Sequence, residues 1–129
     1  MAWCFEDETT AYTERILNAF SNGTEAIVPA LWPFDVGNAL LVAERRKRIN
    51  TSQVIGLLSR IAGLPITVET TTARSAFTQV LPLARERDLA DYDAAYLELA
   101  LRHAVPLATL DHSLRRAARL SGVNLAGLL

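Results

Sequence analysis

The sequence has little of several things that define common protein classes. Its one cysteine, Cys4, allows no internal disulfide and no zinc site built from cysteines. The longest apolar stretch, Ala26–Phe34, contains two prolines and is far shorter than the roughly 20 residues that span a membrane. The apolar start at Met1–Phe5 has no basic segment before it and is followed at once by acids, unlike a secretory signal. We therefore expect a cytoplasmic protein that lies outside membranes.

Glycine and histidine are also sparse, and neither forms a common catalytic motif. The six glycines match neither GxGxxG nor GxxxxGK[ST], which excludes the usual dinucleotide-binding and P-loop enzymes. His103 and His112 belong to no HExxH pair, and no GxSxG turn supplies a hydrolase serine. Lysine occurs once, at Lys47, so almost all of the 13 basic residues are arginines.

The composition that remains is that of a folded domain. Of the 129 residues, 50% are hydrophobic and 21% are charged, and the formal net charge is −1. A chain of this length is typical of one domain, so we expect a single domain over 1–129. The charge balance excludes a strongly basic coat for nucleic acid and leaves room for a local basic patch.

Short apolar runs alternate with longer segments of helical periodicity. Strands are predicted at Ala26–Val28, Ile66–Val68, Leu107–Leu110 and Val123–Leu125. Helices are predicted before, between and after these strands from apolar residues at helical spacing. In the first half of the chain the apolar faces are Tyr12, Ile16, Ala19 and Phe20; then Val36, Leu40 and Ala43; then Ile55, Leu58 and Ala62, in a helix capped by Thr51 or Ser52. In the second half they are Ala73, Phe77, Val80, Leu81 and Ala84, followed by a buried helix along Asp91–Ala104 and a helix along Asp111–Leu120 that ends at Gly122. This order predicts an α/β fold with a parallel sheet between helices.

Three aspartates lie where predicted helices begin. Asp35 follows the first predicted strand, with Asn38 one turn later; Asp93 follows a cap expected at Asp91; and Asp111 directly follows Leu107–Leu110. Each alone is explained by the unpaired backbone N–H groups of a helix N-terminus, which favour acids. Together they suggest more, because ligands of open α/β sheets bind beyond the carboxyl ends of the strands. Converging carboxylates repel one another unless a cation intervenes, and Mg²⁺ or Mn²⁺ prefers such oxygen ligands.

At these residues the sequence resembles the PIN-domain family, specifically the VapC-type toxins of toxin–antitoxin systems. The matching stretches follow one another along the chain: Ala2–Glu8, Ile27–Leu41, Leu89–Ala100 and Pro106–Asp111. The resemblance implies a PIN-like three-layer α/β/α fold with a short parallel sheet flanked by helices. It also implies an endoribonuclease toxin that hydrolyses RNA phosphodiester bonds with water activated by Mg²⁺ or Mn²⁺.

Carried over residue by residue, the resemblance makes Asp35, Asp93 and Asp111 the catalytic metal ligands. Asn38 and Thr109 support them, and Asp35 stands where the family usually has a glutamate. That shorter side chain favours a water-mediated contact. The family further implies a VapB-type antitoxin and a homodimer.

The family's first strand, which ends in another ligand aspartate, has no counterpart in this sequence. The resemblance therefore implies either that Met1 is internal to a longer natural protein or that the sheet is rebuilt without this strand. The alternative is a catalytically inactive PIN-like protein that binds RNA or an antitoxin. A receiver domain is disfavoured because it needs a late lysine.

The basic residues have two interpretations each. Arg115, Arg116 and Arg119 follow Asp111 on one predicted helix, where they either contact an RNA backbone or form a solvated face. Arg45–Arg48 ends another predicted helix, where cations suit the helix dipole; phosphate contact is the other interpretation.

Overall fold

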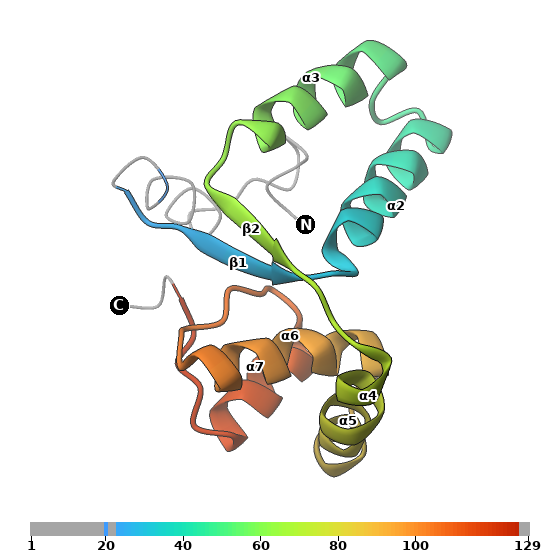
Figure 1. Cartoon of the computed structure of the whole chain (residues 1–129). Coiled ribbons are helices and arrows are strands. Elements are labelled where there is room, and N and C mark those ends of the chain that lie inside the picture. The colour runs from blue at the N-terminus through green and yellow to red at the C-terminus, as the bar shows by residue number, and fades with distance from the viewer. Residues whose placement is uncertain (1–19, 21–22, 127–129) are drawn as a thin grey trace. The chain divides into compact units, whose positions relative to one another are not determined.

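The structure, a computed structural model, describes residue 20 and residues 23–126, and it is of mixed α/β class. Strands β1 (Ala26–Pro29) and β2 (Ile66–Glu69) pair in a two-stranded parallel sheet (Figure 1). Helices α2 (Trp32–Arg45) and α3 (Thr51–Ala62) connect the two strands. Parallel neighbours need such a crossover, because a tight turn reverses the chain. The α/β prediction and both of these strands are therefore confirmed.

The chain divides into two compact units. Unit 1 comprises Met1–Ile27 and Leu31–Thr67, and unit 2 comprises Val28–Ala30 and Val68–Leu129. The expectation of one domain over 1–129 stays a prediction. The helix predicted around Tyr12 and Ile16 lies outside the described residues, apart from Phe20, which is helical. No described helix is long and apolar enough to cross a membrane.

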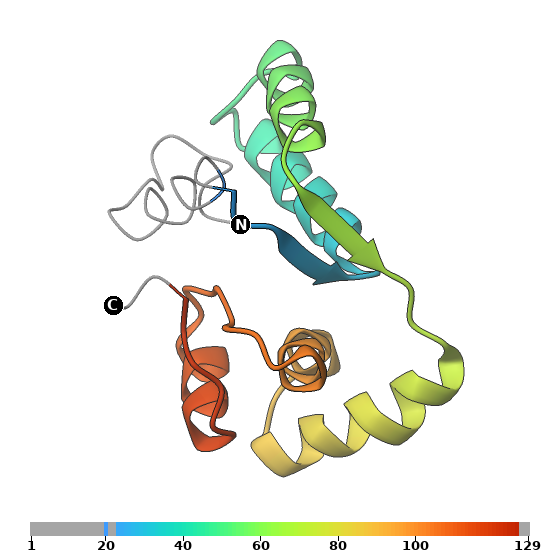
Figure 2. The same ribbon diagram turned by 60° about the vertical axis from the view of Figure 1, so that its left-hand side comes forward.

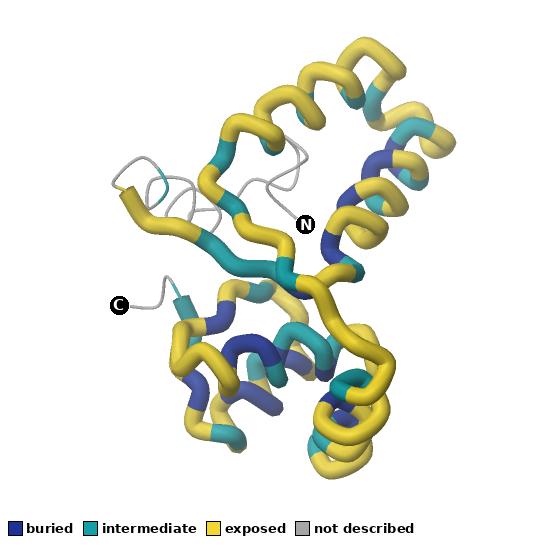
Figure 3. The backbone as a smooth tube through the Cα atoms, viewed as in Figure 1, coloured by how far each residue is buried: buried dark blue, intermediate teal, exposed yellow. Residues whose placement is uncertain are grey.

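Helix α2 of unit 1 follows the sequence pattern closely. Pro33 occupies its first turn, where the missing N–H costs nothing. The buried residues are spaced by three or four positions and make one face, seen as dark segments in Figure 3: Trp32, Val36, Leu40 and Ala43. This is the predicted apolar face, extended by one tryptophan.

Helix α3 begins one residue earlier than expected, and its cap is a correction. Asn50, not Thr51 or Ser52, is the N-cap residue. The Asn50 side-chain oxygen accepts from the Gln53 backbone N–H at 2.8 Å, and Gln53 Oε1 accepts from the Asn50 N–H at 2.8 Å. This reciprocal capping box satisfies two backbone donors at once. The helix ends at Gly63, which is its C-cap residue.

In unit 2, α4 (Ala73–Ser75), the π-helical turn η3 (Ala76–Val80) and α5 (Leu81–Arg87) form one continuous helix (Figure 2). Thr72 caps its start by accepting from the Ser75 N–H at 3.1 Å. The π turn precedes Pro82, which cannot donate the helical hydrogen bond. Val80 and Ala84 are buried as predicted, but Phe77 is 69% exposed. The predicted apolar face is wrong at Ala73, Phe77 and Leu81, which are all exposed. The π turn interrupts the α-helical period on which that face was predicted.

Helix α6 (Asp91–His103) is the centre of unit 2 and packs against η3, α5 and α7 (His112–Leu120). Leu97 is fully buried among side chains of α6, α7 and the segments that flank α7: Ala100, Leu107, Leu114, Ala117, Ala118 and Val123. The helix is confirmed, but it is only partly buried, because Tyr92 and Leu101 are exposed. The cap at Asp91 is wrong: Ala90 is the N-cap and makes no side-chain cap hydrogen bond, so exposed Asp91 lies in the first turn instead.

Two predicted strands, Leu107–Leu110 and Val123–Leu125, reduce to a single parallel bridge between Leu107 and Leu125. The Leu107 N–H donates to the Asn124 carbonyl, and the Leu107 carbonyl accepts from the Ala126 N–H, each at 2.9 Å. Pairing stops there because the chain turns next, with the Asp111 N–H donating to Thr109 Oγ1 at 3.1 Å.

Three described helices end at a left-handed residue that is not glycine. Lys47, Asp88 and Ala104 have φ of 60°, 54° and 52° after α2, α5 and α6. In each case the next N–H bonds back five residues: Arg48 to Ala43, Leu89 to Ala84, and Val105 to Ala100. Glycine usually occupies this position because it lacks the Cβ that clashes there. Helix α7 follows that rule, with Gly122 at φ 77°.

Substituting glycine for exposed Ala104 should therefore stabilise unit 2. Left-handed backbone costs alanine about 1–2 kcal/mol, and the entropy of an unfolded glycine takes back about 0.5–1 kcal/mol. We expect Ala104→Gly to raise the free energy of unfolding by roughly 0.5–1 kcal/mol in urea titrations. Ala95→Gly, inside α6, is the control and should lower it by about 1 kcal/mol. A loss of stability in Ala104→Gly would contradict this account of the helix end.

Candidate functional site

Asp111 is held by the helix that it starts. Its Oδ2 accepts from the Leu114 N–H at 2.8 Å, which confirms the predicted N-cap role. Only Oδ2 takes part in this cap, so Oδ1 remains available for a second partner. Asp111 thus has the geometry both of a structural cap and of a carboxylate with one oxygen to offer.

Thr109 and Arg115 fix the turn in front of Asp111. Thr109 Oγ1 accepts from the Asp111 N–H, and the Thr109 carbonyl accepts from Arg115 Nε at 2.7 Å. Arg115 is half-buried, whereas Arg116 and Arg119 are exposed on α7. Of the three arginines considered for RNA contact, Arg115 therefore also stabilises the turn by donating to the Thr109 carbonyl. The sequence analysis did not predict this hydrogen bond.

Asp93 and Asp35 both lie in first turns of helices, as predicted. Asp93 is a half-buried residue of α6, next to Ala94, which is fully buried. Asp35 is exposed in α2, and exposed Asn38 lies three positions on along the same helix face. Acids in these turns face the positive end of the helix dipole.

The units divide the three aspartates: Asp93 and Asp111 belong to unit 2, and Asp35 belongs to unit 1. Within residues 20 and 23–126, no group of three or more His, Cys, Asp or Glu side chains is placed to hold a metal ion. Asp93 and Asp111 therefore lie in one compact unit. A metal site formed by all three aspartates stays a prediction.

A charged network at the end of β2 is a second polar feature of unit 2. Glu69 accepts from Arg102 and also contacts His103 Nε2 at 2.6 Å. Arg102 Nε donates to Glu98 Oε1 at 2.8 Å, and its Nη2 donates to Oε2 at 3.3 Å. The i, i+4 spacing of Glu98 and Arg102 is readable from the sequence, but nothing local places Glu69 beside them.

Charge in this network shifts two ionisation equilibria. The Arg102 hydrogen bond is the largest cause that lowers the pKa of Glu69 below its ordinary value of 4.5, with His103 adding to it. The two glutamates, Glu98 first, raise the pKa of Arg102. Beside the network lies a polar pocket of about 180 Å³, whose lining residues are Glu69, Thr70, Thr71, Thr72, Ser75, Gln79 and Arg102.

Removing the Arg115 side-chain donor should loosen the Asp111 turn. We expect Arg115→Met to lower the free energy of unfolding by about 1–2 kcal/mol, because a charge-assisted hydrogen bond to a half-buried carbonyl is lost. Arg116→Met removes the same charge from an exposed neighbour and should change it by less than about 0.5 kcal/mol. Urea unfolding followed by circular dichroism measures both, and equal losses would show that Arg115 does not brace the turn.

The Glu69 network should make stability depend on acid pH. Because the folded pKa of Glu69 lies below 4.5, its stabilisation is present above that pH and is lost as pH falls through the folded pKa. The free energy of unfolding of Glu69→Gln should therefore change less steeply with pH below 4.5 than that of the original protein. Glu86→Gln is the control, since Glu86 is 67% exposed and 3.9 Å from Arg87. Parallel curves for Glu69→Gln and the original protein would contradict the role of the network.

Comparisons with known proteins supply no relative from which a role could be transferred. No protein-family model matches the sequence, and no curated protein matches it. The function of the chain therefore has to be inferred from the chemistry of its own residues.

Proposed function

We propose that the chain is a metal-dependent endoribonuclease of the PIN kind, similar to VapC toxins. The observation that carries the proposal is the braced turn Thr109–Asp111, which presents one oxygen of Asp111 at the start of α7. Asp93 lies in the first turn of helix α6 of the same unit. In the family that the sequence resembles, acids in these two places hold the catalytic cation.

The donor set fits a hard divalent cation. Asp35, Asp93 and Asp111 offer only carboxylate oxygens, the ligands that Mg²⁺ and Mn²⁺ prefer. Mg²⁺ keeps several waters and is commonly held by one or two carboxylates together with substrate phosphates. Two protein carboxylates in unit 2 are therefore enough to start such a site, with Asp35 as the proposed third.

In the proposed division of tasks, the metal ligands come from the family resemblance and the residues that brace Asp111 come from the contacts. Asp93 and Asp111 hold the ion, Thr109 sets the direction of Asp111, and Arg115 holds the Thr109 carbonyl. Asn38 supports Asp35 from the next turn of α2. When bound, the ion lowers the pKa of a water molecule and neutralises charge on the scissile phosphate.

The remaining features of the proposal concern fold and partners. A three-layer PIN-like arrangement, cytoplasmic location, homodimerisation and a VapB-type antitoxin that covers the acids all follow from the resemblance. The alternative proposal is a catalytically inactive PIN-like protein that binds RNA or an antitoxin.

RNA cleavage in the presence of Mn²⁺ tests the proposal directly. The original protein should cut a labelled single-stranded RNA into fragments with 5′-phosphate and 3′-hydroxyl ends, and EDTA should abolish cutting. Asp93→Asn should reduce the cleavage rate by about 100-fold or more, because a neutral amide is a poorer ligand for the ion. Fragment ends are read by their response to phosphatase and to a 5′-phosphate-dependent exonuclease.

The matched control is Asp88→Asn. Asp88 is an exposed aspartate of the same unit at φ 54°, a conformation that asparagine also tolerates. Cleavage by Asp88→Asn should equal that of the original protein. Equal cleavage by Asp93→Asn would remove the role of Asp93, and RNA binding without any metal-dependent cleavage would favour the inactive reading.

A further inference from the structure

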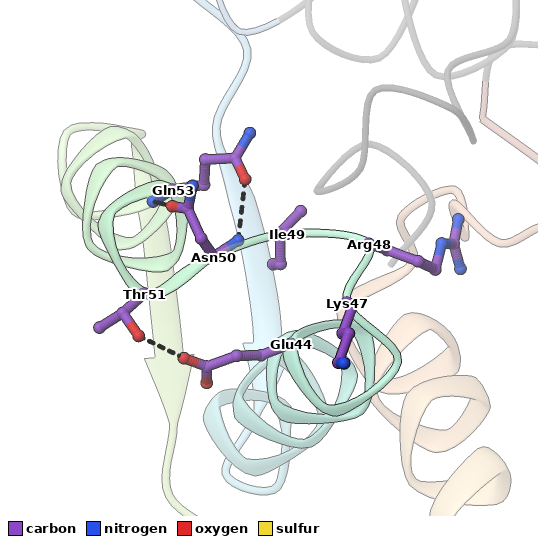
Figure 4. A pocket seen from close by; sticks show the side chains of 7 residues that line it. All are labelled: Glu44, Lys47, Arg48, Ile49, Asn50, Thr51 and Gln53. Atoms are coloured by element: carbon purple, nitrogen blue, oxygen red, sulfur yellow. Dashed lines mark hydrogen bonds between the residues drawn. The ribbon is translucent and has the colours of Figure 1, made fainter.

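The turn between α2 and α3 forms a polar pocket in unit 1, away from the aspartates considered above in sequence and in chemistry. Its volume is about 370 Å³, and seven residues line it: Glu44, Lys47, Arg48, Ile49, Asn50, Thr51 and Gln53 (Figure 4). Only Ile49 among them is apolar. A lining of this kind favours a polar or charged ligand over an apolar one.

The charge around this pocket is positive. Lys47 and Arg48 line it, and the exposed residues Arg45 and Arg46 precede them directly. Arg45, Arg46 and Lys47 are all exposed, and Glu44 is the one acid among the lining residues. The dipole of α2 accounts for Arg45, which lies in its last turn, but residues 46–48 follow the end of the helix.

The single acid of the pocket already has a partner on α3. Glu44 Oε1 accepts from Thr51 Oγ1 at 2.7 Å, which ties the end of α2 to the start of α3 (Figure 4). The start of α3 contains no acid in its first turn. Its backbone N–H groups add positive potential on the same side of the turn. Both features favour an anion over a cation in the pocket.

The cations are spread along the turn rather than gathered around one point. Figure 4 shows the side chains of Lys47 and Arg48 leaving the turn in different directions. Such an arrangement matches successive negative charges along a chain better than one isolated anion. The repeated charge of a nucleic-acid backbone, about one phosphate for every nucleotide, provides that pattern.

We infer that the α2–α3 turn is a binding site for the phosphate backbone of single-stranded RNA, with Lys47 as its central contact. The choice of RNA rests on the proposed nuclease function, whereas the phosphate chemistry rests on the pocket and its charge. In this site Lys47, together with exposed Arg45 and Arg46, binds backbone phosphates without reading bases. The site anchors RNA and takes no part in cleavage.

The backbone at Lys47 gives an unusually clean test variant. Lys47 has φ 60° and is exposed, so glycine fits its conformation better than lysine does. Lys47→Gly therefore removes one positive charge while the thermal midpoint should stay the same or rise. A folding defect cannot then explain a loss of binding.

The measurement is fluorescence anisotropy of a labelled single-stranded RNA 20-mer with the full chain in EDTA, so that no cleavage occurs. At low salt, Lys47→Gly should raise the Kd by about fivefold, and the slope of log K against log salt should fall by about 0.7 in magnitude. The matched control is Arg60→Gln, which removes one charge from the last turn of α3. It should leave the slope unchanged.

Three other results of these binding experiments would decide for or against the proposed RNA site. Equal effects of Lys47→Gly and Arg60→Gln would show that only net charge matters and would overturn the site. Unchanged RNA binding, with weaker binding to vesicles that contain phosphatidylserine, would also overturn it in favour of a lipid surface. Weaker RNA binding by Lys47→Gly in a chain that shows no Mn²⁺-dependent cleavage would support the anchor and reject the proposed nuclease.

Discussion

The backbone groups that a helix leaves unpaired at its ends govern most of the polar chemistry of this chain. Each helix N-terminus has N–H groups that need acceptors, and each C-terminus has carbonyls that need donors. Asn50, Thr72 and Asp111 meet the first need with their side chains. Residues in left-handed conformation meet the second need, because the N–H of the residue after each of them donates to a carbonyl of the helix. The candidate site and the basic pocket both lie at such helix ends.

This constraint explains why a cap and a ligand are hard to tell apart. Asp111 is a good N-cap whatever else it does, because Oδ2 satisfies the Leu114 N–H. A carboxylate has two oxygens, however, and the cap uses one of them. The additional brace from Arg115 to the Thr109 carbonyl is not needed to cap a helix. That extra contact is what separates this turn from an ordinary helix start.

Local signals in the sequence predicted the local structure well. The apolar spacing from Val36 to Ala43 gave the buried face of α2, and Gly122 marked the end of α7 correctly. The apolar face predicted on α3 is not buried, since Ile55, Leu58 and Ala62 are all exposed. Other errors arose where two local signals competed. At Asn50 three polar residues in a row could each cap the helix, and at Phe77 a π turn interrupted the α-helical period.

Pairings between distant residues were beyond the same reasoning. Strand propensity at Leu107–Leu110 was sound, but only one residue found a partner before the Thr109–Asp111 turn began. Glu69 meets Arg102 and His103 across more than thirty positions of sequence, and no periodicity encodes that contact. The positions of Asp93 and Asp111 in the first turns or caps of helices were predictable, because a helix start depends on residues within one turn of it. The same holds for α7 as a whole.

Electrostatics links the two proposed sites. Carboxylates that hold a cation repel RNA phosphates wherever the cation does not neutralise them, and a chain with net charge −1 has no general attraction for a polyanion. Affinity must then come from a local excess of positive charge. Four of the 13 basic residues stand together at Arg45–Arg48, beside a helix start that contains no acid. In the proposed scheme, Asp93 and Asp111 at the helix starts of unit 2 bind the cation, with Asp35 of unit 1 as the third ligand, and the bases at the α2–α3 turn of unit 1 bind the RNA backbone.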